Sequence, residues 1–199
     1  MHDATPTLER TRSQLSLHIL QAEHRQRRAT CEPGCTHCCH QLVPLAPGEP
    51  DAIADAIAEL PSDLQAKVRF RTLAAEAHFD AIGLLELTSD LAAAPAGGLA
   101  MLGEQWRNEW QACPLLIDQR CAIYDDRPLA CRAQAVVSDP AECGKHAGRV
   151  VPLDHQGRGI VGDLCAERGE PPVGLLSVLI ASVGEAGGRE VGLADAAGR

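Results

Sequence analysis

Aromatic residues are scarce in this sequence, and their scarcity limits how a core can be built. Phenylalanine, tryptophan and tyrosine make up 3% of the 199 residues, whereas apolar residues of all kinds make up 45%. The core must therefore consist mainly of leucine, isoleucine, valine and alanine. Because alanine favours helices whereas strands favour branched and aromatic residues, this composition predicts a mostly α fold with little sheet.

Positive charge is also scarce, since the formal net charge is -9. A protein that binds nucleic acid as its main partner needs clustered lysine and arginine to neutralise phosphates. The one short basic run, Arg25 to Arg28, is typical of the C-terminal end of a solvated helix. We therefore expect no nucleic-acid partner.

Long apolar runs and a leader pattern are missing as well. The longest apolar run, Val173 to Gly184, is too short to span a bilayer. The polar N-terminal residues lack the positive and then apolar pattern of a secretory signal. We therefore expect no membrane partner and a reducing cytoplasm of bacterial type. There, nine cysteines are expected to be metal ligands or redox groups rather than disulfides, and an odd number cannot all pair within one chain.

The hydrophobic pattern predicts helices joined by irregular loops, in a single domain that spans residues 1–199. The predicted helices are Leu8–Ala29, Asp51–Leu60, Ser62–His78, Leu84–Ala93, Leu99–Trp110 and Pro172–Glu185. We expect residues 31–132 to carry the functional motifs. Residues 133–199 are expected to form a loop-rich extension, with a hairpin candidate at Val150–Gly162 and a C-terminal helix.

A first group of cysteines lies within nine residues of sequence: Cys31, Cys35, Cys38 and Cys39. Pro33 and Gly34 indicate a loop, which either continues to the double cysteine or enters a helix there. Four thiols so closely spaced between proline and glycine are not explained by core packing. If the double cysteine is extended, its two side chains point to opposite faces, which suits bridging or a division of labour.

A second group, Cys113, Cys121 and Cys131, begins 74 positions after Cys39. Its first two members lie on short extended pieces around a turn, and Cys131 falls in a helical turn expected after Pro128. Two groups of thiols on loops are typical of closed sulfur sites, and thiolates bind zinc or iron in a cluster. Seven thiols exceed one tetrahedral site, so some are spectators, two sites exist, or the two adjacent cysteines serve different purposes. A site of four thiolates with a divalent ion carries a net charge of about -2.

Two arginines flank the last of these cysteines. A guanidinium at ~5 Å from a thiolate site contributes about 3 kcal/mol per unit charge at an effective dielectric constant near 20. The tight spacing of Arg127 and Arg132 around Cys131 therefore predicts that both support the bound thiolates without binding the metal.

These residues carry a family resemblance. The segment "CEPGCTHCC" and the later "CPLLIDQRCAIYDDRPLACR" resemble the cysteine-cluster family of zinc- or iron-chelating proteins, the CxxCxxCC or YkgJ type. The first segment matches at Cys35, Cys38 and Cys39, and Cys31 departs from the family spacing by one residue. The second matches at Cys113, Pro114, Cys121, Ile123, Tyr124, Arg127, Pro128, Cys131 and Arg132. Tyr124 is thereby added to the residues expected beside the metal-binding thiols.

The resemblance implies metal binding, with an iron–sulfur cluster and zinc as competing cofactors. A flagellin lysine methylase, which joins such a cysteine domain to an enzyme activity and is associated with an iron–sulfur cluster, favours a [4Fe–4S] cluster. One alternative is a redox or metal-transfer protein that uses exposed thiols. Another is an accessory to a cluster-dependent enzyme such as a protein methylase. The sequence shows no second motif for catalysis, and we expect no enzymatic activity of its own.

The remaining candidates have simpler interpretations. Cys143 and His146 have metal-like spacing, but such pairs in loops are mostly incidental. Cys165 stands alone and is expected to be a small buried hydrophobe. His37 and His40 flank the double cysteine, where hydrogen bonding to thiolates or exposure to solvent explains them. The carboxylate of Glu49 is expected on a solvated helix face near the helix N-terminus.

Overall fold

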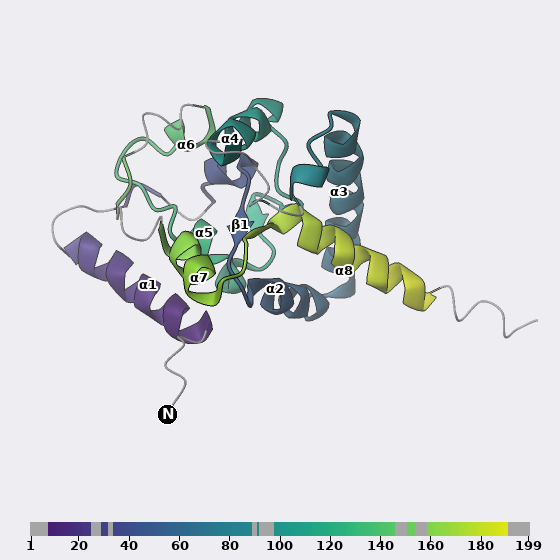
Figure 1. Ribbon diagram of the computed structural model, residues 1–199, viewed down its shortest axis with the longest axis horizontal. Coiled ribbons are helices and arrows are strands. Elements are labelled where there is room, and N and C mark those ends of the chain that lie inside the picture. Colours follow the sequence, from purple (N-terminus) through teal and green to yellow (C-terminus); the bar gives the residue numbers. More distant parts are fainter. Residues whose placement is uncertain are drawn as a thin grey trace, which may run out of the picture.

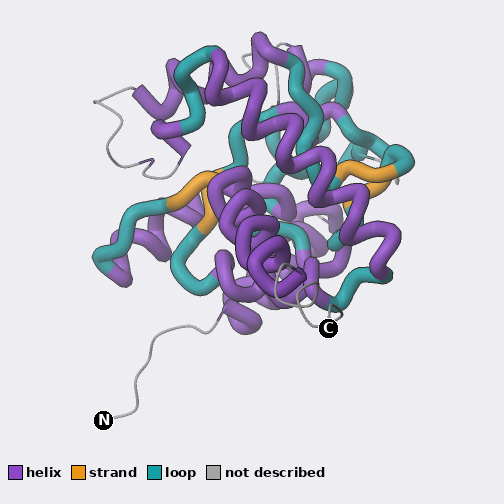
Figure 2. The backbone as a smooth tube through the Cα atoms, turned by 90° about the vertical axis from the view of Figure 1, so that its right-hand side faces the viewer, coloured by secondary structure: helices purple, strands orange, loops and turns teal. Residues whose placement is uncertain are grey.

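The computed structural model describes residues 8–24, 29–31, 34–88, 91, 98–145, 151–153 and 159–190, and over these residues the chain is mostly helical. Figure 1 and Figure 2 show helices connected by loops, with only short strands. The prediction of a mostly α fold with little sheet is confirmed. The helices are α1 (Leu8–His24), α2 (Glu49–Ala58), α3 (Ser62–Ala81), α4 (Gly98–Glu109), α5 (Leu129–Arg132), α6 (Glu142–Lys145), α7 (Ile160–Arg168) and α8 (Leu175–Glu190).

The described strands form two small antiparallel pairs. Strand β1 (Pro44–Leu45) pairs with β4 (Val173–Gly174), and β2 (Leu116–Ile117) pairs with β3 (Arg120–Cys121). The second pair is a hairpin whose two turn residues, Asp118 and Gln119, have φ angles of 48° and 62°. Left-handed residues at both central positions give the turn a twist that matches the strands. The extended pieces predicted around a turn are thus confirmed as a hairpin.

Two predicted elements in less regular sequence are wrong. In place of a helix over Leu84–Ala93, the described residues form the short 3-10 turn η2 (Glu86–Thr88). The hairpin candidate Val150–Gly162 is wrong at its end, because Ile160 begins helix α7, and residues 150 and 154–158 of it lie outside the described residues. Glycines near the start of α7 obscure its hydrophobic periodicity in the sequence. In the structure, Leu164 and Cys165 of α7 pack against α5, and Gly169 ends the helix with a φ angle of 67°.

The largest apolar cluster lies where α8 crosses α2 and α3 (Figure 1). Its most buried members come from strands as well as helices: Leu45, Ile53, Val68, Leu115 and Leu179. An adjoining cluster stacks Phe79 of α3 on Trp106 of α4, with ring centroids 3.6 Å apart. The few aromatic residues are therefore not spread through the core, and aliphatic side chains fill most of it.

A separate cluster surrounds the short helix α5. Helices α1 and α7 lie against it (Figure 1), and the buried side chains of Leu15, Leu129 and Val161 meet there. A helix of four residues gains little from its own hydrogen bonds. Packing by these neighbours therefore holds α5 in place.

The start of α8 depends on a close approach of two backbones. A Cβ atom added at Gly174 would lie 2.8 Å from the backbone oxygen of Thr88. Real Cβ atoms essentially never come this close, so only glycine lets β4 pass η2 here. None of the described helices is long and apolar enough to cross a bilayer.

Candidate metal centre

The first cysteine segment folds into a tight turn. Residues His37–His40 form the 3-10 helix η1, and the amide of Cys39 donates to the carbonyl of Thr36 at 2.9 Å. Of the two alternatives for the double cysteine, the helical one is correct. Cys38 and Cys39 therefore do not point to opposite faces of a strand, and both line one cavity.

The second cysteine segment is held by local turns. Cys113 precedes the β2–β3 hairpin, Cys121 ends β3, and Cys131 lies in α5. Between the last two, the 3-10 turn η4 (Tyr124–Asp126) reverses the chain before Pro128 begins the next turn. These reversals bring three thiols that are spread over nineteen residues of sequence to the same cavity.

Backbone and ring contacts hold the two segments together. The amide of Cys113 donates to the carbonyl of Cys39 at 2.7 Å. The ring of His40 stacks on Trp110, which follows α4, with ring centroids 4.2 Å apart and an angle of 7° between the planes. His40 therefore packs the first segment against the residues that lead into the second.

The two segments line a shared cavity of about 420 Å³. Six of the seven candidate thiols belong to its wall: Cys35, Cys38, Cys39, Cys113, Cys121 and Cys131. Apolar side chains of Val43, Leu115 and Leu175 complete much of the remaining wall. The fold thus gathers, around one hollow, thiols that lie 74 or more positions apart in sequence.

The other cysteines lie elsewhere. Cys31 is exposed and is not part of the cavity wall. Cys165 is buried in the cluster around α5, which confirms the sequence prediction. Cys143 is buried on α6, which packs against η1, and its possible partner His146 lies outside the described residues.

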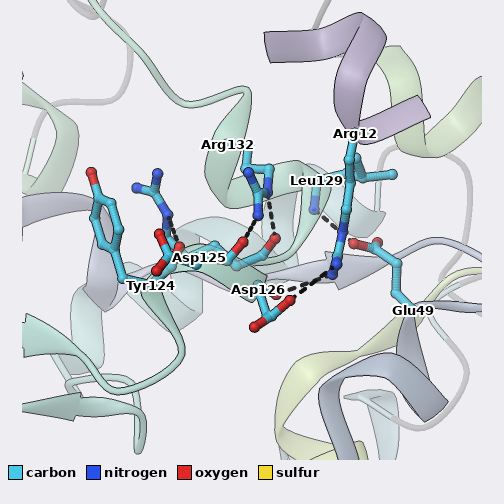
Figure 3. A network of polar contacts seen from close by, with 8 residues as sticks. Arg12, Glu49, Tyr124, Asp125, Asp126, Leu129 and Arg132 are labelled. Carbon is cyan, nitrogen blue, oxygen red and sulfur yellow. Dashed lines mark hydrogen bonds and ion pairs between the residues drawn. The ribbon is translucent and has the colours of Figure 1, made fainter. Parts of the chain in front are cut away.

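The two flanking arginines lie in different environments. Arg127 lines the cavity, its guanidinium stacks 3.6 Å from the ring centroid of Tyr124, and its charge lowers the pKa of the Cys121 thiol against the larger effect of burial. Arg132 instead donates to the carbonyls of Asp125 and Arg127 (Figure 3). The structure therefore places Arg127 and Tyr124 beside the thiols, whereas Arg132 stabilises the η4 turn through these two hydrogen bonds.

Burial is the largest influence on the pKa of three cavity thiols, Cys113, Cys121 and Cys131. It raises the pKa of Cys131 well above its ordinary value and that of Cys113 to about 12. Hydrogen bonding from the thiol of Cys39 lowers the pKa of Cys38 to about 7, with a smaller contribution from Arg127, and raises that of Cys39. Because thiols bind metals as thiolates, a metal that enters this cavity has to displace protons.

Sequence reasoning missed two charged side chains near the site. Arg71 of α3 donates to the carbonyl of Cys113 at 3.4 Å, and its charge acts to lower the pKa of that thiol. Glu49 was expected on a solvated face, and this is wrong, because Glu49 is fully buried. A glutamate in the first turn of a helix is so common that its sequence position gave no sign of burial.

The donor set suits a thiophilic metal. Among the described residues, no three histidine, cysteine, aspartate or glutamate side chains are already placed as a closed site for one ion. The six cavity thiols are nevertheless the ligands that zinc and iron–sulfur clusters take, and Arg127 supplies the opposite charge.

Comparison with known proteins agrees with this donor chemistry. A family model named CxxCxxCC, described as "Putative zinc- or iron-chelating domain", matches residues 30–149, well over half of the chain. The matched residues include both cysteine segments, whereas α1, α7 and α8 lie outside them. No curated protein and no solved structure gave a match. The resemblance seen in the sequence is confirmed, and the chain belongs to the CxxCxxCC family of zinc- or iron-chelating domains.

Proposed function

We propose that this protein binds an iron–sulfur cluster, of the [4Fe–4S] type, between its two cysteine segments. The observation that carries the proposal is the single cavity of about 420 Å³ with six thiols in its wall. A closed zinc site needs only four thiolates, and Zn–S bonds of about 2.3 Å bring their sulfur atoms within about 3.8 Å of one another. The cavity offers both more room and more thiols than such a site requires.

Four thiols are the best candidates for cluster ligands. Cys38, Cys113, Cys121 and Cys131 line the cavity, and each lies close enough to at least one other to affect its pKa. Cys39 would act on a bound cluster through its hydrogen bond to Cys38, and Cys35 is the remaining thiol of the wall. A bound cluster would supply one-electron redox chemistry, and its potential depends on hydrogen bonds and nearby charge.

Arg127 is the residue that offsets the negative charge of the bound thiolates. It is the arginine that lines the cavity and whose charge helps to lower the pKa of Cys38 and opposes the rise that burial causes in the pKa of Cys121 and Cys131. Its stacking on Tyr124 fixes the guanidinium at the wall, since a cation over an aromatic face is held by the ring's charge distribution.

The composition of anaerobically purified protein tests the choice of cofactor. We expect a brown protein that absorbs near the blue edge of the visible spectrum and contains iron and acid-labile sulfide. A colourless protein that contains zinc and no sulfide would reject the cluster and leave a zinc site.

A second candidate function is metal or electron transfer through free thiols, and the lowered pKa of Cys38 favours it. A thiol with a pKa of about 7 is partly ionised at neutral pH and reacts faster than its neighbours. On this alternative, iodoacetamide at pH 7 alkylates Cys38 of the metal-free protein first, and the loaded protein passes its metal to a thiol acceptor. Uniform alkylation of the cavity thiols, without transfer, would exclude it.

A further inference from the structure

A single buried carboxylate connects the residues after the first cysteine segment to the helix that carries Cys131. Glu49 lies at the start of α2 and is fully buried. One carboxylate oxygen, Oε1, accepts the amide of Leu129 at 2.7 Å, and the other, Oε2, accepts the amide of Ala46 at 2.7 Å. Figure 3 shows the carboxylate beside the first residue of α5.

This contact supplies what α5 lacks. The first amides of any helix have no partner within the helix, and α5 has only four residues with which to hold itself. Pro128, the residue before α5, makes no capping hydrogen bond with its own side chain, so the amide of Leu129 depends on Glu49. Cys131 lies two residues further on, in the cavity wall.

Two arginines act on the charge of this carboxylate, and one of them, Arg12, lies outside the family region. Burial raises the pKa of Glu49, whereas the two amides and the nearby charges of Arg12 and Arg132 act to lower it. Arg12 comes from α1, and it also contacts Asp126 through a 3.3 Å ion pair and a 3.1 Å hydrogen bond to the backbone carbonyl (Figure 3). A buried charge is tolerated where hydrogen bonds and nearby opposite charge replace the lost water, and Glu49 accepts two amides and lies near the charges of Arg12 and Arg132.

We infer that Glu49, with Arg12 of α1, is a positioning residue that fixes the α5 turn and thereby holds the Cys131 thiol at the cavity wall. That this thiol serves a metal rests on the proposed function, whereas the positioning itself does not. The amide contacts, and not the negative charge alone, are what place Cys131.

The test uses the full chain, reduced and free of metal, so that it does not depend on whether a metal binds. Glu49→Leu removes both acceptors while nearly keeping the side-chain volume, and Glu49→Gln keeps one acceptor. Asp51→Leu is the matched control, because Asp51 lies in the same first turn of α2 but is exposed. The readouts are amide hydrogen exchange over α5 and the rate at which iodoacetamide alkylates Cys131, both by mass spectrometry.

We expect Glu49→Leu to speed both readouts at α5 by about tenfold or more, the effect of losing one hydrogen bond to a charged acceptor. Glu49→Gln should fall between this variant and the wild type, and it serves as the test if Glu49→Leu does not fold. Exchange in α3 and α8 should stay unchanged in Glu49→Gln, as should all readouts in Asp51→Leu.

Three results would overturn the inference. They are unchanged exchange at α5, an equal acceleration in α3 and α8, or an equal effect of Asp51→Leu. Metal content of the wild-type protein is measured in parallel. If it is zero while α5 responds as expected, the proposed function fails and the positioning role stands.

Discussion

Removing the metal is expected to destabilise the protein by about 4 kcal/mol and to release both cysteine segments. A centre that joins Cys39 or its neighbours to Cys113 closes a loop of about 74 residues. In the chain-entropy model, closing a loop of this length removes about 4 kcal/mol of freedom from the unfolded chain. By comparison, the direct hydrogen bond between the amide of Cys113 and the carbonyl of Cys39 contributes only about 1 kcal/mol.

The size of this effect sets the expected shift in melting temperature. For a protein of 150–250 residues, each kcal/mol changes Tm by roughly 2–4 °C, so stripping the metal should lower Tm by about 8–16 °C. The helices should nevertheless persist, because α8 contacts α2 and α3 mainly through apolar side chains of the helices themselves, although Cys113 and Cys121 also pack against this cluster. The loss should therefore concentrate in the loops that carry the thiols.

The assay compares holoprotein with protein treated with chelator and reductant under anaerobic conditions. Circular dichroism at 222 nm follows Tm, and limited proteolysis with mass spectrometry locates new cleavage sites. We expect cuts near η1 and near the β2–β3 hairpin only after metal removal, and the same behaviour in the control variant Cys165→Ser. An apoprotein that melts at the same temperature as the holoprotein would refute the reasoning. The metal would then bind a site that is already formed and would not stabilise the contact between the two segments.

Three further changes test the surroundings of the centre. Arg127→Ala should weaken metal retention at neutral pH, measured by competition with a chelator, whereas the exposed control Arg168→Ala should leave it unchanged. Arg132→Ala should lower Tm, because Arg132 holds the η4 turn, and it should reduce metal retention less than Arg127→Ala does. Because burial raises the pKa of Glu49, its carboxyl group binds a proton more tightly in the folded state than in the unfolded state. The contribution of Glu49 to the free energy of unfolding should therefore fall as pH rises above about 4.5. Urea titrations at several pH values should show this slope in the wild type and lose it in Glu49→Gln. Gly174→Ala should destabilise the protein by about 1–3 kcal/mol, because the new methyl group would overlap the backbone carbonyl of Thr88. Unchanged unfolding in urea would contradict this, because η2 could then move aside at no cost in free energy.

Sequence patterns predicted the elements that depend on local signals. The proline and polar residues around α2 and α3 placed their starts within two residues, and the cysteine spacing identified both segments that line the cavity. These features are readable because hydrophobic periodicity and breaker residues act over a few positions. Likewise, Cys165 lay on its own in sequence and proved to be a core residue.

Features that depend on distant contacts were not predictable in the same way. The burial of Glu49 depends on an amide 80 positions away, and the contact of Arg71 with Cys113 spans 42 positions. The difference between Arg127 and Arg132 is likewise set by the η4 turn rather than by their spacing around Cys131. In each case the residue type was visible in the sequence, and only the packing decided its partner.

The most direct test of the central claim, that thiols from both segments hold one centre, is the metal content of paired cysteine variants. Cys38→Ser and Cys131→Ser, which change one thiol in each segment, are purified anaerobically beside the control Cys165→Ser, and metal per chain is measured by mass spectrometry. We predict that either cavity variant loses most of its metal while the control keeps it all. Full metal content in either cavity variant would contradict the claim, since a thiol assigned as a ligand from that segment would then be dispensable to the centre.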